Sequence, residues 1–330
     1  MKIQLTLDSF AVMLYCSDLI PTNHPALTNE EWLEVEKCLK SSAMKDVSRL
    51  FGMHFDALTQ LAGINEYIAK KILDRNTLMA DLFYSLHNLE NEGIQVTTKY
   101  GDNYPNSLLK LKKRAPLVLY YVGDLSLIKD DNVSIMGPQT LEKKLNFATK
   151  NIVTKIYDEG RTLITGGLKG IDAYATKTML NLGGHVICFV SDHMFDKMKL
   201  YSKPIKTGEM LLICAVDPYA YFNFTNALDR NIYVCGLSKE QFVVATHSSK
   251  GPVYFTSLQN FHYHWTKQLV FSDENYSGNL RLIEMGAIPV TDEDLLSLMT
   301  IEEIIEKNEP QVVINEPVVD QMSIFEFIEK

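Results

Sequence analysis

Long apolar runs and cysteine are both scarce in this sequence of 330 residues. No apolar run approaches the roughly 18 residues that a membrane-spanning helix needs. Residues 1–20 lack the basic start, apolar centre and small-residue cleavage site of a secretory signal. The five cysteines are far apart and form no CxxC pair, which favours reduced, buried thiols over disulfides. We therefore expect a cytoplasmic protein that does not contact a membrane.

An excess of basic residues is missing as well, because the formal net charge is −9. Residues 291–330 contain eleven Asp or Glu and two Lys, so this acidic end accounts for the whole net charge. The rest of the chain is neutral overall and can carry a local basic face. The charge therefore does not exclude a nucleic-acid partner.

The common catalytic and nucleotide-binding motifs are absent from the sequence. It contains no GxxxxGK[ST], no GxSxG and no HExxH, and the turn at Gly137 does not have the GxGxxG pattern. His262 and His264 have no carboxylate at the spacing of a metal ligand. We therefore expect no catalytic residue, no metal site and no cofactor.

The most informative stretch is Leu163–Thr176, in which a short apolar run, three glycines and a helix-forming segment follow one another. This order predicts a strand, a turn and a helix. At Gly166, Gly167 and Gly170 the backbone N–H groups can approach an anion, and the helix N-terminus adds partial positive charge. We expect this turn to hold a phosphate group.

Two charged residues accompany this turn. Lys169 lies inside it and would neutralise a bound phosphate; the alternative is an exposed lysine without a ligand. Asp172 follows the turn, where capping of the helix through nearby amides is a better interpretation than catalysis. Gly137 lies in a second strand-turn-helix unit, and a doubly wound sheet would bring both turns to the same edge.

The pattern along the chain predicts three parts. Residues 1–97 form a small helical module of the SAM or helix-hairpin-helix type, with a hairpin centred on Gly63. Residues 98–290 alternate strand-like and helix-like segments, which predicts an α/β fold with a mainly parallel, doubly wound sheet. Residues 291–330 form an acidic linker and tail.

Several motifs in the second part occur in the order of a known family. They are Asp102-Asn103-Tyr104-Pro105, Thr165–Ala175, Arg230-Asn231 with Gly236-Leu237-Ser238, and Gly278-Asn279 with Leu282-Ile283 and Gly286-Ala287. On these motifs, the chain resembles the DNA-processing protein A (DprA or Smf) family over about residues 90–290.

The resemblance implies an extended Rossmann-like domain that binds single-stranded DNA without catalysis. It also implies a homodimer and a RecA-type recombinase as a partner. Backbone amides and cations at such a site track phosphates without reading sequence, and Tyr or Phe rings can stack on bases. The DNA contacts that it implies are Gly137, Gly166, Gly167, Lys169, Gly170, Asp172, Arg230 and Asn231.

The chain departs from the family pattern at several positions. Gln139 stands where the family motif GSR has its arginine, Ile232 replaces the last residue of RNR, and Thr176 replaces a histidine. We also expect no winged-helix domain at the C-terminal end. Loss of two arginines predicts weaker or more salt-sensitive DNA binding, for which the basic run Lys110–Arg114 is a candidate compensating patch.

The tail contains a second resemblance, in residues 321–325. Gln-Met-Ser-Ile-Phe is similar to the pentapeptide by which bacterial proteins dock on the DNA polymerase sliding clamp. Ile324 and Phe325 would be the apolar anchors, and Gln321 would form hydrogen bonds. The alternative is a tail helix that packs on its own domain.

Two other functions stay open from the sequence alone. One is a nucleotide-binding sensor or a nucleotide-cleaving enzyme of the wider superfamily, although Thr165–Thr176 lacks the glutamate that cleavage of a glycosidic bond needs. The other is a degenerate scaffold that binds only protein. We favour the non-enzymatic protein that binds single-stranded DNA.

Overall fold

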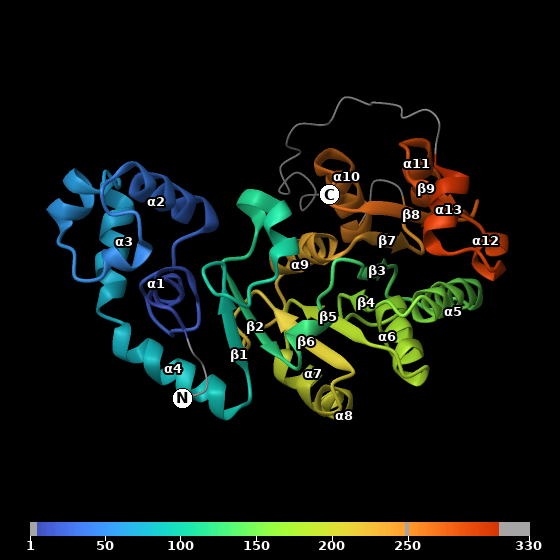
Figure 1. The fold of residues 1–330 in the computed structure, drawn as a ribbon, viewed down its shortest axis with the longest axis horizontal. Helices are drawn as coiled ribbons and strands as arrows, with labels where there is room; N and C mark the ends of the chain where they lie inside the picture. The colour runs from blue at the N-terminus through green and yellow to red at the C-terminus, as the bar shows by residue number, and fades with distance from the viewer. Residues whose placement is uncertain (1–4, 248–250, 310–330) are drawn as a thin grey trace.

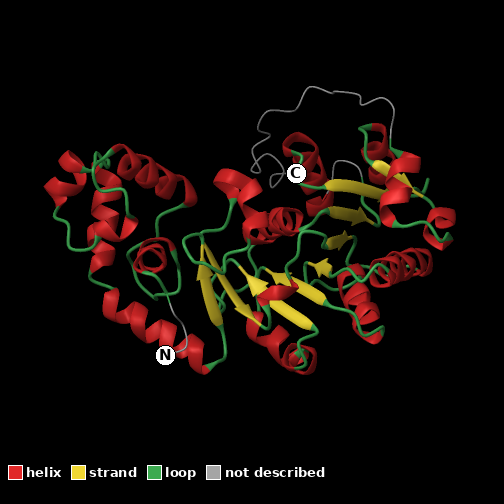
Figure 2. Ribbon diagram, in the orientation of Figure 1, coloured by secondary structure: helices red, strands yellow, loops and turns green. Residues whose placement is uncertain are grey.

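The apolar runs of the central part pair into one sheet in the computed structural model, which describes residues 5–247 and 251–309 (Figure 1). These residues form a nine-stranded sheet in the order β1-β2-β6-β5-β4-β3-β7-β8-β9 (Figure 2). Its first two strand pairs, β1 with β2 and β2 with β6, are antiparallel, and the others are parallel. The strands are β1 (Gln95–Thr98), β2 (Val118–Val122), β3 (Val133–Met136), β4 (Leu163–Thr165), β5 (Val186–Val190), β6 (Met210–Cys214), β7 (Glu240–Val243), β8 (Lys267–Phe271) and β9 (Ile288–Val290).

Helices cover both faces of this sheet (Figure 1). The central strand β5 alternates between them, with Val186, Cys188 and Val190 in one apolar cluster and Ile187 and Phe189 in the other. One face carries α5 (Lys143–Asp158), α6 (Ile171–Asn181), α7 (Met194–Leu200) and α8 (Ser202–Lys206); the other carries η3 (Asn106–Arg114), α9 (Phe224–Leu237), α10 (Gly251–Tyr263) and α11 (Ser277–Glu284), and the short η4 (Leu125–Leu127) follows β2. The expected doubly wound α/β fold is confirmed.

The helical module precedes the sheet, and polar contacts hold both its own segments and its junction with the sheet. Arg75 is buried and donates to the carbonyl oxygens of Leu14, Ser17 and His24, which closes the C-terminal end of the first helix. Lys99 donates to Glu36 across the junction at 3.1 Å. The module contains α1 (Leu7–Cys16), α2 (Asn29–Ser41), η1 (Val47–Leu50), η2 (Ala57–Leu61), α3 (Glu66–Asn76) and α4 (Met79–Asn91), and the expected boundary after residue 97 falls inside β1.

The expected start of the linker at residue 291 is wrong, because the fold continues to residue 308. Two further helices, α12 (Asp292–Leu296) and α13 (Ile301–Asn308), follow β9, and each begins with a capping box. The first turns of both helices are acidic, whereas Ile301, Ile304 and Ile305 are buried against the sheet. High acidic content therefore concealed an amphipathic helix.

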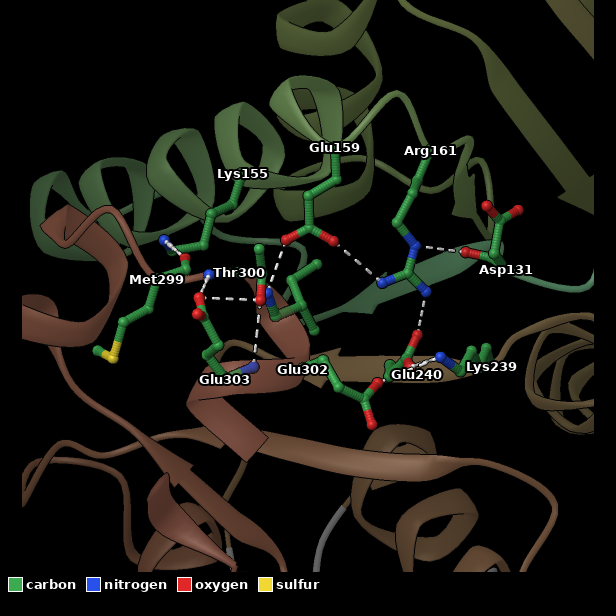
Figure 3. Close-up of polar contacts among 11 residues, drawn as sticks. Asp131, Lys155, Glu159, Arg161, Lys239, Glu240, Met299, Thr300, Glu302 and Glu303 are labelled. Carbon is green, nitrogen blue, oxygen red and sulfur yellow. Dashed lines mark hydrogen bonds and ion pairs between the residues drawn. The ribbon is translucent and has the colours of Figure 1, made fainter. Parts of the chain in front are cut away.

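Polar contacts at the amino edge of the sheet hold these helices in place (Figure 3). Lys155 of α5 donates to the carbonyl oxygens of Ser297 and Met299 at 2.9 and 2.5 Å. Arg161, at the start of β4, pairs with Glu159 and with the buried Glu240 of β7. Because Arg161 is paired with acids and Lys155 donates to carbonyl oxygens, we assign these contacts a structural role.

None of the helices within the described ranges has both the length and the apolar character that a membrane crossing requires.

Candidate nucleic-acid interface

The two glycine turns lie against each other at the carboxyl edge of the parallel strands. The Ile171 amide of α6 donates to the Pro138 carbonyl oxygen at 3.1 Å. Gly170 has a φ of 75°, and a Cβ there would lie 2.4 Å from the carbonyl carbon of Gln139. A Cβ at Gly137 would lie 2.8 Å from the Ile171 side chain. The glycines are needed because the two turns form one closely packed unit.

Asp172, Arg230 and Asn231 lie beneath this unit rather than on its surface. The exposed fractions of Asp172 and Arg230 are 5% and 2%. Arg230 donates to the Gly166 carbonyl oxygen and, at 2.9 Å, to Asn231 Oδ1. The Leu168 amide donates to Asp172 Oδ2 at 3.3 Å. The carboxylate therefore occupies part of the turn from inside, as an anion would, and these residues shape the turn.

The electrostatics of this pair reflect its burial. Loss of water raises the pKa of Asp172, and the Arg230 cation and backbone hydrogen bonds oppose that rise. Burial likewise lowers the pKa of Arg230, which the Asp172 carboxylate counteracts. Each group therefore favours the charged form of the other, and both lie beneath Gly166, where they support the turn rather than offer a free contact for a phosphate.

Two lysines reach the surface on either side of the turn. Lys169 is exposed at its tip. Lys197 comes from α7, and its Nζ donates to the Gly167 carbonyl oxygen at 2.5 Å. An ammonium group has three donors, so Lys197 keeps two for a ligand. The sequence argument found Lys169 but missed Lys197, whose only local signal is a lysine in the first helix after β5.

The start of α5 adds positive charge at the same edge. Its N-cap residue, Glu142, makes no side-chain capping hydrogen bond, and Lys143 and Lys144 occupy the first turn. Lysines in the first turn are unfavourable next to the positive end of the helix dipole, and a bound anion there would be favourable. Lys144 is paired with Asp273 at 2.8 Å, whereas Lys143 is exposed. A phosphate beside Lys143 would complement both the lysine and the free amides of the first turn.

Aromatic side chains are concentrated in the loop between β6 and α9. We call residues 219–224 the aromatic segment. Tyr221 and Phe222 are 81% and 62% exposed. Tyr219 packs on Phe195 with the ring centroids 4.7 Å apart, and the His193 amide donates to the Ala220 carbonyl oxygen. The segment therefore lies beside the start of α7, next to Lys197. The run Tyr-Ala-Tyr-Phe-Asn-Phe was visible in the sequence but was not singled out.

At the other end of the carboxyl edge, near β3 and β7, side chains of the protein bond to one another. A doubly wound sheet usually binds its nucleotide where the strand order reverses, here between β3 and β7. Tyr276 donates to Glu142 at 2.7 Å across this point, next to the Lys144–Asp273 pair. Asn279 donates to the carbonyl oxygens of Val244 and Phe271. The Gly278-Asn279 motif is thus structural, and the open part of the edge runs from β3 to β6.

The basic run at Lys110–Arg114 lies elsewhere. Lys110 donates to the Ser238 carbonyl oxygen at 2.9 Å, and the Arg114 guanidinium lies 5.3 Å from the Tyr263 ring centroid. Ser238 and Tyr263 precede β7 and β8, so this run is at the amino edge and does not replace the missing arginines at the glycine turns. The two positions where the family pattern has arginines differ in burial, since Gln139 is exposed and Ile232 is part of the core.

A pocket of about 740 Å³ lies near the amino end of β6, between η3 and η4. Its lining includes the carboxylates of Asp102, Asp124 and Asp130 and no cation, so a phosphate is not its ligand. Among the described residues, no three His, Cys, Asp or Glu side chains are grouped to hold a metal ion. The tail residues Gln321, Ile324 and Phe325 lie outside the described residues.

Comparison with solved structures finds the same fold. DNA processing protein A (DprA) from Streptococcus pneumoniae is similar with a TM-score of 0.69 and 17% identity, over 91% of this chain and 100% of that chain. DNA processing protein A from Helicobacter pylori, whose structure describes a single-stranded DNA binding mode, has a TM-score of 0.50 and 21% identity, over 59% and 90% of the two chains. A search of the curated proteins finds no match.

A family model gives the assignment independently of these structures. The model of DNA recombination-mediator protein A matches residues 95–300, which is more than half of the chain and includes the whole sheet. The expected resemblance is confirmed, and the chain belongs to the family of DNA recombination-mediator protein A, the DNA-processing protein A family.

Proposed function

We propose that this protein binds single-stranded DNA along the carboxyl edge between β3 and β6, and that it does so without catalysis. The observation that carries the proposal is that Lys169, on the glycine turn, and Lys197, which contacts that turn from α7, lie near the exposed aromatic segment. The cations suit phosphates, and the rings suit bases that are not paired. The relative from Helicobacter pylori supports the proposal, since it binds single-stranded DNA.

The dimensions of this edge suit a short strand. Three strand intervals separate β3 from β6, and at about 4.8 Å each they span roughly 14 Å. Successive phosphates of an extended single strand are farther apart than the roughly 3.4 Å axial rise of a duplex, so this length accommodates only a few of them. Lys143, Lys169 and Lys197 come from three successive units along this edge, which matches a backbone that crosses it.

Fluorescence anisotropy with a labelled single-stranded oligonucleotide at two salt concentrations tests the proposal. The double variant Lys169→Ala/Lys197→Ala should bind about tenfold more weakly at low salt, and its salt slope should fall by about 1.4, because each phosphate contact contributes about 0.7. Lys112→Ala, at the exposed amino-edge run, is the matched control and should bind as the wild type does.

Two outcomes would reject this function. No binding by the wild type, or equal binding by the double variant and the wild type, would remove the carboxyl edge as a DNA site. A mononucleotide that raises the melting temperature of the wild type would favour the nucleotide-binding alternative instead.

We also propose that residues 321–325 bind the sliding clamp. The support is the sequence of this peptide, with Ile324 and Phe325 as anchors after an acidic, proline-containing stretch. Ile324→Ala/Phe325→Ala should abolish clamp pull-down while oligonucleotide binding stays unchanged. Equal pull-down by the variant and the wild type would reject the assignment.

A homodimer and a RecA-type recombinase partner stay predictions. Light scattering at several protein concentrations tests the dimer, and pull-down with a purified recombinase tests the partner. A monomeric mass at all concentrations, or no recombinase in the pull-down, would contradict them.

A further inference from the structure

Three lysines form a stripe along the helices that connect β5 to β6. Lys199, Lys203 and Lys206 occupy positions i, i+4 and i+7, and all three are exposed. The Tyr201 amide donates to the Lys197 carbonyl oxygen, and the Ile205 amide donates to the Tyr201 carbonyl oxygen. Tyr201, with φ −105° and ψ 23°, separates α7 from α8, so Lys199 lies at the end of the first helix, whereas Lys203 and Lys206, three positions apart, share one side of the second.

The stripe has a charge that the described part of the chain does not neutralise. None of its lysines forms an ion pair with a described residue, and the two acids of the same stretch have other partners. Asp196 lies 3.7 Å from the His193 ring nitrogen, and Glu209 accepts from the Thr207 hydroxyl. Like charges one turn apart destabilise a helix, so this arrangement favours an anionic partner.

The stripe is continuous with the carboxyl edge. Lys197 belongs to the same helix, one turn before its end, and contacts the glycine turn through the Gly167 carbonyl oxygen. The start of α7 is joined to the aromatic segment by the His193–Ala220 hydrogen bond. Figure 1 shows α7 and α8 side by side along one face of the sheet, beneath β5 and β6. Lys199 follows Lys197 by two positions and therefore lies on another side of α7, where a strand that passes around this helix would meet it.

We propose that Lys199, Lys203 and Lys206 bind the phosphate backbone of single-stranded DNA beyond the carboxyl edge, and so extend the site to longer strands. This inference rests on the proposed function of that edge. The three ammonium groups suit a short run of phosphates, with one contact for each lysine. The glycine turn then binds any short strand, and the stripe adds affinity only when the strand is long enough to reach it.

Binding of two oligonucleotides of different length, measured by anisotropy on the full chain, tests the proposal. One has about five nucleotides and covers only the carboxyl edge; the other has about fifteen and reaches the stripe. Lys199→Gln/Lys203→Gln/Lys206→Gln should weaken the long strand about tenfold and change the short strand less than about twofold. The salt slope for the long strand should fall by about 2, from three lost phosphate contacts.

The control variant is Lys110→Gln/Lys112→Gln/Lys113→Gln, which removes the same charge at the amino edge. It should leave the long strand bound as tightly as the wild type binds it. Equal loss for both strand lengths, equal loss in both triple variants, or no loss at all would each overturn the proposal; the last result would point to an acidic protein partner for the stripe. If the wild type binds neither strand, the proposed function of the carboxyl edge fails first.

Discussion

Replacement of Asp172 by alanine should destabilise the fold strongly, although the residue lies in a turn. The side chain is 5% exposed and Arg230 is 2% exposed, and the change removes the carboxylate whose charge most favours the buried guanidinium. Breaking a direct buried ion pair costs about 3–5 kcal/mol, and Asp172 and Arg230 interact through their charges without such a direct pair. Arg230 keeps Gly166 O and Asn231 Oδ1 as acceptors, which places the expected loss near the lower end, about 3 kcal/mol.

Urea unfolding followed by circular dichroism measures this loss. With a denaturant slope of about 3 kcal/mol per molar, the midpoint should fall by about 1 M. Asp130→Ala, an exposed acid, is the control and should change the free energy of unfolding by less than about 0.5 kcal/mol. Lys169→Ala should also leave the midpoint unchanged, because its side chain is exposed.

The double variant Asp172→Ala/Arg230→Met separates this explanation from a general defect. It removes the unpaired cation, so it should recover at least about 1 kcal/mol relative to Asp172→Ala alone. DNA binding should stay weak in the recovered protein, since Gly166 loses the guanidinium that holds its carbonyl group. A loss below about 1 kcal/mol for Asp172→Ala, or purely additive single losses, would refute the reasoning.

Three further predictions concern other positions. Gln139→Arg, at an exposed place beside the glycine turn, should strengthen single-strand binding and raise the salt slope by about 0.7; a binding titration that shows no gain would contradict this. Gly170→Ala should cost more than about 2 kcal/mol in urea unfolding, because its Cβ would overlap Gln139, whereas Gly183→Ala, also at positive φ but with open space, should cost about 1 kcal/mol. Burial opposes ionisation of Asp294, but hydrogen bonds from Lys307 and neighbouring groups outweigh that effect and lower its pKa. The stability that the Asp294 carboxylate contributes is therefore present above the unfolded pKa of about 3.9, and it is lost as the pH falls through the lower pKa of the folded state. Asp294→Asn should remove this part of the acid transition, and an unchanged acid profile would exclude it.

The sheet and its glycine turns could be predicted because their signals are local. Buried parallel strands have short apolar runs, and Gly166–Gly170 lies directly between such a run and a helix. The residues that contact the turn are distant in sequence, so the local pattern could not predict these contacts. Nothing near Arg230 reveals that its side chain is buried under Gly166, 64 residues away in the chain. The matched motif therefore linked Arg230 to the glycine turn but did not reveal that its side chain is buried.

The remaining differences have similar physical causes. Ile232 looked like a lost DNA contact, yet α9 turns that position into the core. The buried isoleucines of α13 were concealed by acids that serve as helix caps. The aromatic segment was overlooked because its residue types do not reveal whether the side chains are exposed. The same residues in a buried strand would belong to the core.

Photocrosslinking tests the central claim most directly. A single-stranded oligonucleotide with photoreactive bases is irradiated with the wild-type protein, and the attached residues are identified by mass spectrometry. Crosslinks should fall on Tyr221 and Phe222, and competition with an unlabelled single strand, but not with a mononucleotide, should remove them. Crosslinks confined to the helical module or to Lys110–Arg114 would contradict the carboxyl edge as the DNA site.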